Sequence, residues 1–280
     1  MALTPHPEIL SAVQRALEED IASGDITSQL CVPENLQAAG RFLARERLVL
    51  AGVDLLGLIY EQRGGVDAIE LLSHDGDLVQ ANQVVATVRG RARTLLECER
   101  VALNFLQRLS GVATLGRAFV DAVSETDCRI LDTRKTTPGL RRLEKMAAAA
   151  GGVTNHRMGL YDAVLIKNNH IAAAGGVKAA IESARRQAAE MELEVEVRDR
   201  VQLMEALAAG ATHLLFDNLS PDTARDWVSA VQRRATIEIS GGVTLETAAA
   251  YARTGADYVS VGAITHSARA MDLSFRLELI

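Results

Sequence analysis

The sequence predicts an α/β fold in which a parallel sheet with helical crossovers, most simply a barrel, follows an α+β domain. From about residue 129 onward, short apolar runs alternate with helix-like stretches, whereas the first 110 or so residues contain short β-type segments without that alternation. Repeated strand–helix units imply a parallel sheet. The chain has 280 residues, of which 48% are hydrophobic, so it can bury a large core in one or two domains.

The N-terminal part is expected to begin with an amphipathic, acidic helix over the first 20 residues. Strands are expected at 37–43, 48–51, 69–72 and 84–88, with a helix at 54–63 between the second and the third. Asp75-Gly76-Asp77 marks a turn. A helix over 92–109 then leads toward the barrel, and no low-complexity linker separates the two parts.

Six strands are expected in the second part, at 129–133, 163–167, 193–197, 212–216, 236–240 and 258–262, with a possible seventh at 152–155. Helices are expected at 138–150, 177–191, 201–209, 221–233 and 245–254. Thr137 before Pro138 and Ser220 before Pro221 predict capped helix starts, and two glycines, Gly210 and Gly255, follow predicted helix ends. Six or seven strands do not secure a closed eight-stranded barrel.

Positive charge is concentrated in one stretch of an otherwise acidic chain. Residues 129–170 contain eight Lys or Arg and three acids, a balance of +5 within a formal net charge of −6. This favours a small polyanion over a nucleic acid, because a polymer binder is usually basic overall. No apolar run approaches the roughly 20 residues of a membrane span. The three cysteines are scattered, which suits a reducing compartment. We expect a soluble, cytoplasmic protein.

Polar or glycine residues end nearly every predicted barrel strand, where the side chains of an α/β barrel site converge. The ends are Thr133-Arg134-Lys135, Lys167, Glu196, Asp217-Asn218, Ser240-Gly241-Gly242 and Gly262. The two glycine-rich ends predict a phosphate cradle. Glu196 and Asp217 suit a magnesium ion or sugar hydroxyls. Glu194 lies on the same side of its strand as Glu196, as a buried, paired carboxylate. Lys167 is either a carboxylate clamp or a Schiff-base amine.

These residues, in this order, resemble the quinolinate phosphoribosyltransferase family essentially from end to end. The resemblance rests on ALEEDIASGDITS (16–28), ERVALNFLQRLSGVAT (99–114), DTRKTTPGLR (132–141), NHRMGLYDAVLIKNNHI (155–171), EVEV (194–197), FDN (216–218), ISGGV (239–243) and VGAITHS (261–267). It departs at Val153, where the family has a glycine, and at Asn168, where the family often has an acid.

The resemblance implies an α/β fold with an N-terminal α/β sandwich domain (1–112), an incomplete seven-stranded α/β barrel (113–265) and a C-terminal tail (266–280) that packs on the sandwich. It implies a homodimer or higher homo-oligomer. It also implies that quinolinate and phosphoribosyl pyrophosphate give nicotinate mononucleotide, CO₂ and pyrophosphate in NAD biosynthesis, with Mg²⁺.

Site residues carry over by motif. Arg134, His156, Arg157 and Lys167 resemble the quinolinate pocket, and Arg100 resembles an arginine that enters it from the neighbouring subunit. Lys135 and Thr133 resemble pyrophosphate contacts. Glu196 and Asp217 resemble the ligands of magnesium and the ribose. The remaining residues, which resemble the 5-phosphate cradle, are Ser240, Gly241, Gly242, Val261, Gly262 and Ala263.

Three other interpretations remain from the sequence. A paralogue linked to molybdate transport shares the barrel pattern, but LIKNNH, EVEV and Arg100 favour quinolinate. A barrel lyase that forms a Schiff base at Lys167 is disfavoured by the arginines and carboxylates beside that lysine. A regulatory binder without catalysis is disfavoured because Lys135, Glu196 and Asp217 are all present.

Overall fold

The computed structural model describes residues 6–280 and divides the chain into two compact units. The first comprises residues up to Arg117, Thr136–Gly152 and Ile264–Ile280, and the second comprises Ala118–Lys135 and Val153–Ala263. These boundaries differ from the expected 113–265 barrel, because 136–152 belongs to the first unit. None of the helices in the described chain has an apolar stretch long enough to cross a bilayer.

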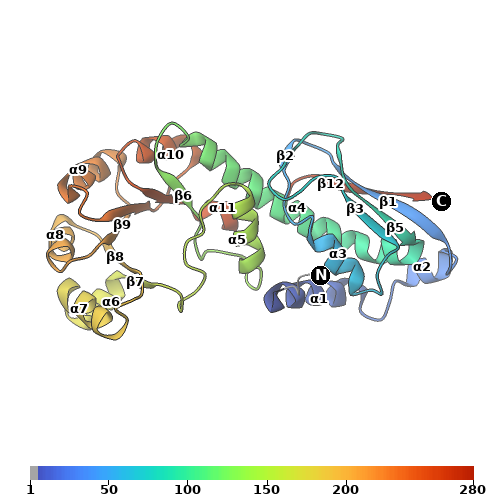
Figure 1. Ribbon diagram of the computed structural model, residues 1–280, viewed down its shortest axis with the longest axis horizontal. Coiled ribbons are helices and arrows are strands. Elements are labelled where there is room, and N and C mark those ends of the chain that lie inside the picture. The colour runs from blue at the N-terminus through green and yellow to red at the C-terminus, as the bar shows by residue number, and fades with distance from the viewer. Residues whose placement is uncertain (1–5) are drawn as a thin grey trace. The chain divides into compact units, whose positions relative to one another are not determined.

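The first unit contains a four-stranded antiparallel sheet in the order β12-β1-β5-β3 and a two-stranded sheet, β2-β4 (Figure 1). Its strands are β1 (Gln37–Ala44), β2 (Leu48–Val49), β3 (Ala68–Leu71), β4 (Leu78–Val79), β5 (Val84–Arg91) and β12 (Leu273–Leu279). Its helices are α1 (Pro7–Ile21), α2 (Ile26–Cys31), α3 (Leu55–Glu61), α5 (Arg141–Ala150) and most of α4 (Ala92–Ala122).

The C-terminal strand completes the sheet of the first unit. β12 pairs with β1 over seven residues, and the register sets Phe42 opposite Phe275, whose ring centroids lie 4.9 Å apart. Directly opposed aromatic side chains stabilise an antiparallel pair. The last residues of the chain therefore close the edge beside β1, where unpaired backbone groups would otherwise face solvent.

Helix α4 continues 13 residues beyond its predicted end at Leu109. Gly111 lies within this helix, and the residue type is explained by its surroundings. A Cβ at this position would stand 1.9 Å from the carbonyl oxygen of Arg269. Glycine at this position serves a close backbone approach rather than a helix end. The helix also supports the loops of its unit, since the Ser110 hydroxyl accepts the backbone N–H of Ala51 and the Thr114 hydroxyl accepts that of Val49.

The second unit is built on a six-stranded parallel sheet in the order β6-β11-β10-β9-β8-β7. The strands are β6 (Arg129–Leu131), β7 (Val164–Ile166), β8 (Leu193–Val197), β9 (His213–Asp217), β10 (Thr236–Ser240) and β11 (Tyr258–Ser260). The helices are α6 (Asn168–Ala174), α7 (Val177–Gln187), α8 (Arg200–Ala208), α9 (Pro221–Val231) and α10 (Leu245–Ala252). A short turn, α11 (Ala263–His266), follows β11, and all of it except Ala263 belongs to the first unit. Figure 1 shows helices α7 to α10 as an outer layer around the strands.

All six predicted barrel strands are confirmed, and the possible seventh is an isolated parallel bridge between Leu131 and Thr154. The barrel is thus incomplete. Val153 stands where the family that the sequence resembles has a glycine. It is buried and is not among the residues with a positive φ. Its side chain therefore causes no left-handed strain at this position.

Two helix starts show how local signals succeed and fail. Ser220 caps α9 as predicted, with its hydroxyl accepting the N–H of Thr223 at 3.2 Å. The predicted cap at Thr137 is wrong, because α5 begins at Arg141 after Leu140. Thr137 instead donates both its N–H and its hydroxyl to Glu144. The tertiary partner replaces the local cap that the Thr-Pro pair suggests.

Candidate active site at the carboxyl ends of the barrel strands

A cavity of about 360 Å³ lies at the carboxyl ends of the strands in the second unit. Eleven of the residues expected in the site line it, namely Thr133, Arg134, Lys135, His156, Arg157, Lys167, Glu196, Asp217, Ser240, Gly241 and Gly242. They come from segments more than 100 residues apart in the chain. The structure thus brings together residues that were selected from the sequence by their position at strand ends with two, His156 and Arg157, that were selected by the family resemblance.

Strand register explains why these residues share one cavity. In parallel pairing, Glu196 is level with Leu215 and Glu238, and Asp217 is level with Ser240. Alternate residues of a strand point to the same face, so both levels line the cavity. One level lower, Glu194, His213 and Thr236 line a second cavity of about 390 Å³. The two cavities share His156, Arg157, Leu165 and Glu238.

Four cationic side chains line the upper cavity: Arg134, Lys135, Arg157 and Lys167. Burial lowers the pKa of Arg157, and the positive charge of Arg134 lowers it further. Arg157 keeps a fixed direction because its Nη1 donates to the carbonyl oxygen of Ala163 at 3.0 Å. Two guanidinium groups that repel each other across a cavity favour an anion between them, and their planar forks suit carboxylates.

Lys167 stands where β7 passes into α6, a helix that the sequence analysis did not predict. Its N–H donates to Nδ1 of His170 at 2.9 Å, which fixes the start of that helix. The side chain is 53% exposed, and its Nζ lies 4.0 Å from Oε2 of Glu196. The ammonium group is therefore oriented by a carboxylate at the cavity edge and can still contact a ligand.

Glu196 and Asp217 present carboxylate oxygens on neighbouring strands. Oε1 of Glu196 accepts a hydrogen bond from Nδ2 of Asn168, and Oδ2 of Asp217 accepts one from Nδ2 of Asn218 at 2.8 Å. Each hydrogen bond engages one oxygen of its carboxylate, and the other oxygen of Glu196 is the one that faces Nζ of Lys167. Magnesium is typically held by one or two protein carboxylates together with water and substrate phosphates, so this donor set fits it.

The loop after β10 provides backbone N–H groups near the start of α10. Gly241 has φ +98° and Gly242 has φ +61°, a region that side chains rarely adopt. A Cβ on Gly241 would lie 2.3 Å from Oδ1 of Asn218, whereas one on Gly242 would meet nothing within 4 Å. Consecutive glycines of this kind, followed by a helix capped at Thr244, suit a phosphate group.

The second glycine-rich strand end, expected to complete the phosphate cradle, does not contribute its three expected residues to the lining of this cavity. Val261, Gly262 and Ala263 are not among its lining residues, and Ser260 lines it instead. The helix that follows, α11, has four residues, too few to contribute a substantial dipole at its N-terminus. Arg100 belongs to the first unit, on α4, and its side chain is exposed.

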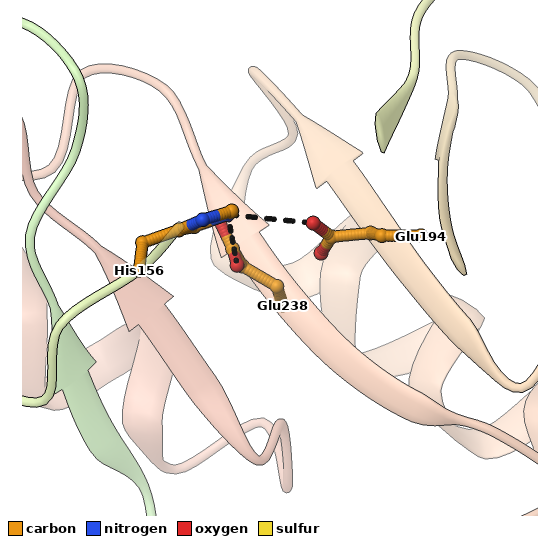
Figure 2. Close-up of side chains that lie close together, drawn as sticks. All are labelled: His156, Glu194 and Glu238. Carbon is orange, nitrogen blue, oxygen red and sulfur yellow. Dashed lines mark ion pairs between the residues drawn. The ribbon is translucent and has the colours of Figure 1, made fainter. Parts of the chain in front are cut away.

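Beneath the cations, three titratable side chains form a compact cluster, shown in Figure 2. Nε2 of His156 lies 3.4 Å from Oε2 of Glu194 and 3.4 Å from Oε2 of Glu238. Burial by itself favours the neutral ring, but hydrogen bonds to the two carboxylates raise the pKa of His156 to about 10. Burial raises the pKa of Glu194, and the nearby Glu238 adds to this effect. The expected pairing of Glu194 is confirmed, with His156 as its partner, but the Glu194 side chain is half-buried rather than buried.

Sequence reasoning missed Glu238 as a residue of the site. Glu238 was identifiable, because it is two residues before Ser240 and so faces the same side of the strand. An acidic residue in the middle of the apolar strand TIEIS is costly to bury without a partner. The same pattern in LEVEV was recognised, and the two acids meet at one histidine.

Comparison with known proteins identifies the family of the chain. The family "Quinolinate phosphoribosyl transferase, C-terminal domain" matches residues 112–276, and its N-terminal domain counterpart matches 25–110. A nicotinate-nucleotide pyrophosphorylase [carboxylating] of Mycobacterium leprae is 45% identical over 95% of both chains. A probable one of Bacillus subtilis is 41% identical over 98% of this chain and 95% of its own.

The fold comparison gives the same result. The structure of the nicotinate-nucleotide pyrophosphorylase from Francisella tularensis superposes with a TM-score of 0.92 at 38% identity, covering 99% of this chain and 98% of that one. The fold is therefore shared with that structure over essentially the whole chain. The chain belongs to the quinolinate phosphoribosyltransferase family.

Proposed function

We propose that the cavity at the carboxyl ends of the barrel strands transfers a phosphoribosyl group to quinolinate. The chain is a pentosyltransferase of NAD biosynthesis that converts quinolinate and phosphoribosyl pyrophosphate into nicotinate mononucleotide, CO₂ and pyrophosphate. The observation that carries the site assignment is the meeting of four cations, three carboxylates and a two-glycine loop in one cavity. A dicarboxylate and a polyphosphate sugar require these three kinds of group.

The cationic side of the cavity binds quinolinate. Arg134, Arg157 and Lys167 face the two carboxylates of the pyridine ring, and Arg100 of a second subunit completes the pocket. The lowered pKa of Arg157, caused by burial and by Arg134, supports this assignment, because bringing a dianion between the two guanidinium groups relieves their repulsion.

The opposite side binds phosphoribosyl pyrophosphate. Lys135 and Thr133 contact the pyrophosphate, the loop Ser240–Gly242 holds the 5-phosphate, and Glu196 and Asp217 hold the ribose hydroxyls and Mg²⁺. Magnesium, when bound, supplies positive charge to the pyrophosphate oxygens. Lys135 stabilises the same leaving group, and its backbone N–H is fixed by the Thr133 hydroxyl at 3.0 Å.

The reaction follows from this layout. Departure of pyrophosphate leaves an oxocarbenium-like centre at C1 of the ribose, and the electron pair of the quinolinate nitrogen forms the new C–N bond. The resulting pyridinium accepts the electron pair of the breaking C2–carboxylate bond as CO₂ leaves, and C2 then takes a proton. The side chains of the cavity contribute orientation and electrostatic stabilisation, so no covalent enzyme intermediate is needed.

The assembly and location belong to the same proposal. We propose a cytoplasmic homodimer or larger homo-oligomer. The three cysteines, Cys31, Cys98 and Cys128, are free, which agrees with a reducing compartment. Burial raises the pKa of Cys98 and Cys128 to about 12, so these two are inert core thiols.

An assay of the purified protein with quinolinate, phosphoribosyl pyrophosphate and Mg²⁺ tests the proposal. Nicotinate mononucleotide and CO₂ are followed together, with nicotinate as a parallel acceptor. Equal amounts of both products from quinolinate, and none from nicotinate, are expected. Turnover of nicotinate would contradict the dicarboxylate pocket. Absence of turnover with intact phosphoribosyl pyrophosphate binding would assign the cavity to another acceptor.

A further inference from the structure

We propose that His156 is a positioning residue that holds the carboxyl groups of Glu194 and Glu238 away from Arg157, so that the Arg157 guanidinium stays available to a substrate carboxylate. This inference rests on the proposed assignment of Arg157 to quinolinate. The expectation from the sequence, that His156 itself contacts quinolinate, is the alternative that the experiment below distinguishes from it.

Contacts within the protein engage both ring nitrogens of His156. Nε2 lies 3.4 Å from a carboxylate oxygen of Glu194 and equally far from one of Glu238, as Figure 2 shows. Nδ1 accepts the backbone N–H of Arg157 at 2.6 Å. The hydrogen bond to Nδ1 favours the neutral imidazole, whereas the two carboxylates favour the protonated, positively charged imidazole. In both states Nε2 carries a proton toward the two carboxylates, so the ring's donor is directed at the protein.

The backbone of His156 is fixed as well as its ring. Its N–H donates to Oδ1 of Asp132 at 2.8 Å, and Asp132 is fully buried after β6. The ring thus stands between the strands that carry the two glutamates and the segment that continues into Arg157. Contacts of the ring and of the backbone therefore fix the position of His156. A side chain that keeps two glutamates away from an arginine needs such a fixed position.

Without the imidazole, the two carboxyl groups need another partner, because Glu238 is buried and the Glu194 side chain is only 14% exposed. A buried carboxylate without a partner is strongly unfavourable. Arg157 is near enough that the charge of Glu194 raises its pKa, against the effects of burial and of Arg134. Glu238 lines both of the cavities that Arg157 lines. A guanidinium binds carboxylates in a two-pronged fashion, so the glutamates would compete with quinolinate for it.

A cycle of variants tests this competition. His156→Phe, which keeps a ring of similar size, is compared with the parent in two backgrounds: the native pair of glutamates, and the Glu194→Gln/Glu238→Gln pair. Quinolinate KM is measured at saturating phosphoribosyl pyrophosphate. In the native background we expect His156→Phe to raise it about tenfold or more, the effect of losing one charged hydrogen bond. In the glutamine background, where no carboxylate competes, we expect a rise of less than about threefold.

The outcomes separate the inference from its rivals. An equally large rise in both backgrounds would mean that His156 contacts quinolinate itself, and would overturn the inference. No rise in the native background would also overturn it. His156→Gln can still donate to one carboxylate, so an intermediate KM is expected; it carries the same two-background comparison if His156→Phe does not fold, as judged by thermal unfolding.

Two controls distinguish a failure of the assignment of Arg157 to quinolinate from a failure of the role proposed for His156. Phosphoribosyl pyrophosphate KM should change little in all of these variants, because its expected contacts lie on the other side of the cavity. Arg157→Ala should raise quinolinate KM far more than that of phosphoribosyl pyrophosphate. If Arg157→Ala affects both substrates equally, the assignment of Arg157 fails. If it affects quinolinate alone but the glutamine background gives no rescue, only the role of His156 fails.

Discussion

Glu144 is fully buried on α5 and links segments of the first unit that are far apart in sequence. Its Oε1 accepts hydrogen bonds from Nη2 of Arg108 at 2.7 Å, from Nε of Arg108 at 3.1 Å and from the Thr137 hydroxyl at 2.6 Å. Its Oε2 accepts the N–H of Thr137 at 2.9 Å. Arg108 also donates to the carbonyl oxygens of Thr265 and Ala268. One carboxylate therefore joins α4, the loop before α5 and the segment that leads to β12.

Replacing Glu144 by Gln removes the charge at nearly constant volume. The amide keeps one acceptor oxygen for Arg108 but turns an N–H₂ group toward the N–H of Thr137, which loses its acceptor. Breaking one partner of a buried ion pair costs about 3–5 kcal/mol. The Arg108 side chain is 26% exposed, so water compensates in part, and we expect the lower end, about 3 kcal/mol. At about 2–4 °C per kcal/mol for a chain of this size, Tm should fall by about 6–12 °C.

Thermal and urea unfolding, followed by circular dichroism, measure the change. Glu125→Gln is the matched control, because Glu125 pairs with Arg253 at 3.1 Å while 82% exposed. An exposed pair contributes at most about 1 kcal/mol. A loss at Glu144 below about 1 kcal/mol, or one equal to that at Glu125, would refute the reasoning that the buried carboxylate holds these segments together.

Three further predictions concern the site, the assembly and pH. Arg100→Ala and Lys167→Ala, each nearly inactive alone, should regain about a quarter of wild-type activity when subunits are mixed, because a hybrid dimer has one intact site if Arg100 crosses the interface; no recovery after demonstrated exchange would exclude a shared site. Gly241→Ala should destabilise the protein by about 1–3 kcal/mol and weaken phosphoribosyl pyrophosphate binding. Both effects should be larger than those of Gly242→Ala, where a Cβ meets open space. Equal losses of stability in the two variants would contradict the close contact at Gly241. Hydrogen bonds from Arg269 lower the pKa of Glu46 to about 2. The stability that Glu46 contributes is therefore present above about pH 4.5 and lost as the pH falls toward 2; a Glu46→Gln variant whose deficit stays constant across that range would contradict this.

Local sequence signals predicted most of the barrel strands because each strand is a short apolar run bounded by helix signals. The bounds of β8 and β10 agree with the expected ranges, and β9 is shifted by one residue. Several elements were missed, among them the helices α2 and α6 and the strands β4 and β12. β12 alternates only weakly in burial, and it forms because β1 offers an open edge.

The site was predictable to the extent that its residues end strands. Polar groups at the ends of parallel strands converge in any such sheet, and this identified Lys135, Lys167, Glu196 and Asp217 without a view of the fold. The same reasoning identified Arg134, the family motifs placed Arg157 with these residues, and all of them line one cavity. The same reasoning placed Val261–Ala263 there, but these three residues are not among those that line the cavity.

The amino-acid sequence by itself determined the class of fold, the family and the chemical character of the site, because periodicity, charge and motif order are properties of the chain. Only the tertiary structure decided which groups are partners. The meeting of His156 with Glu194 and Glu238 depends on the register between strands and on the path of the segment after the bridge at Thr154. The engagement of Thr137 by Glu144, in place of a helix cap, depends on packing in the same way. Pairing of buried polar groups is a property of distances between elements, and no local pattern encodes those distances.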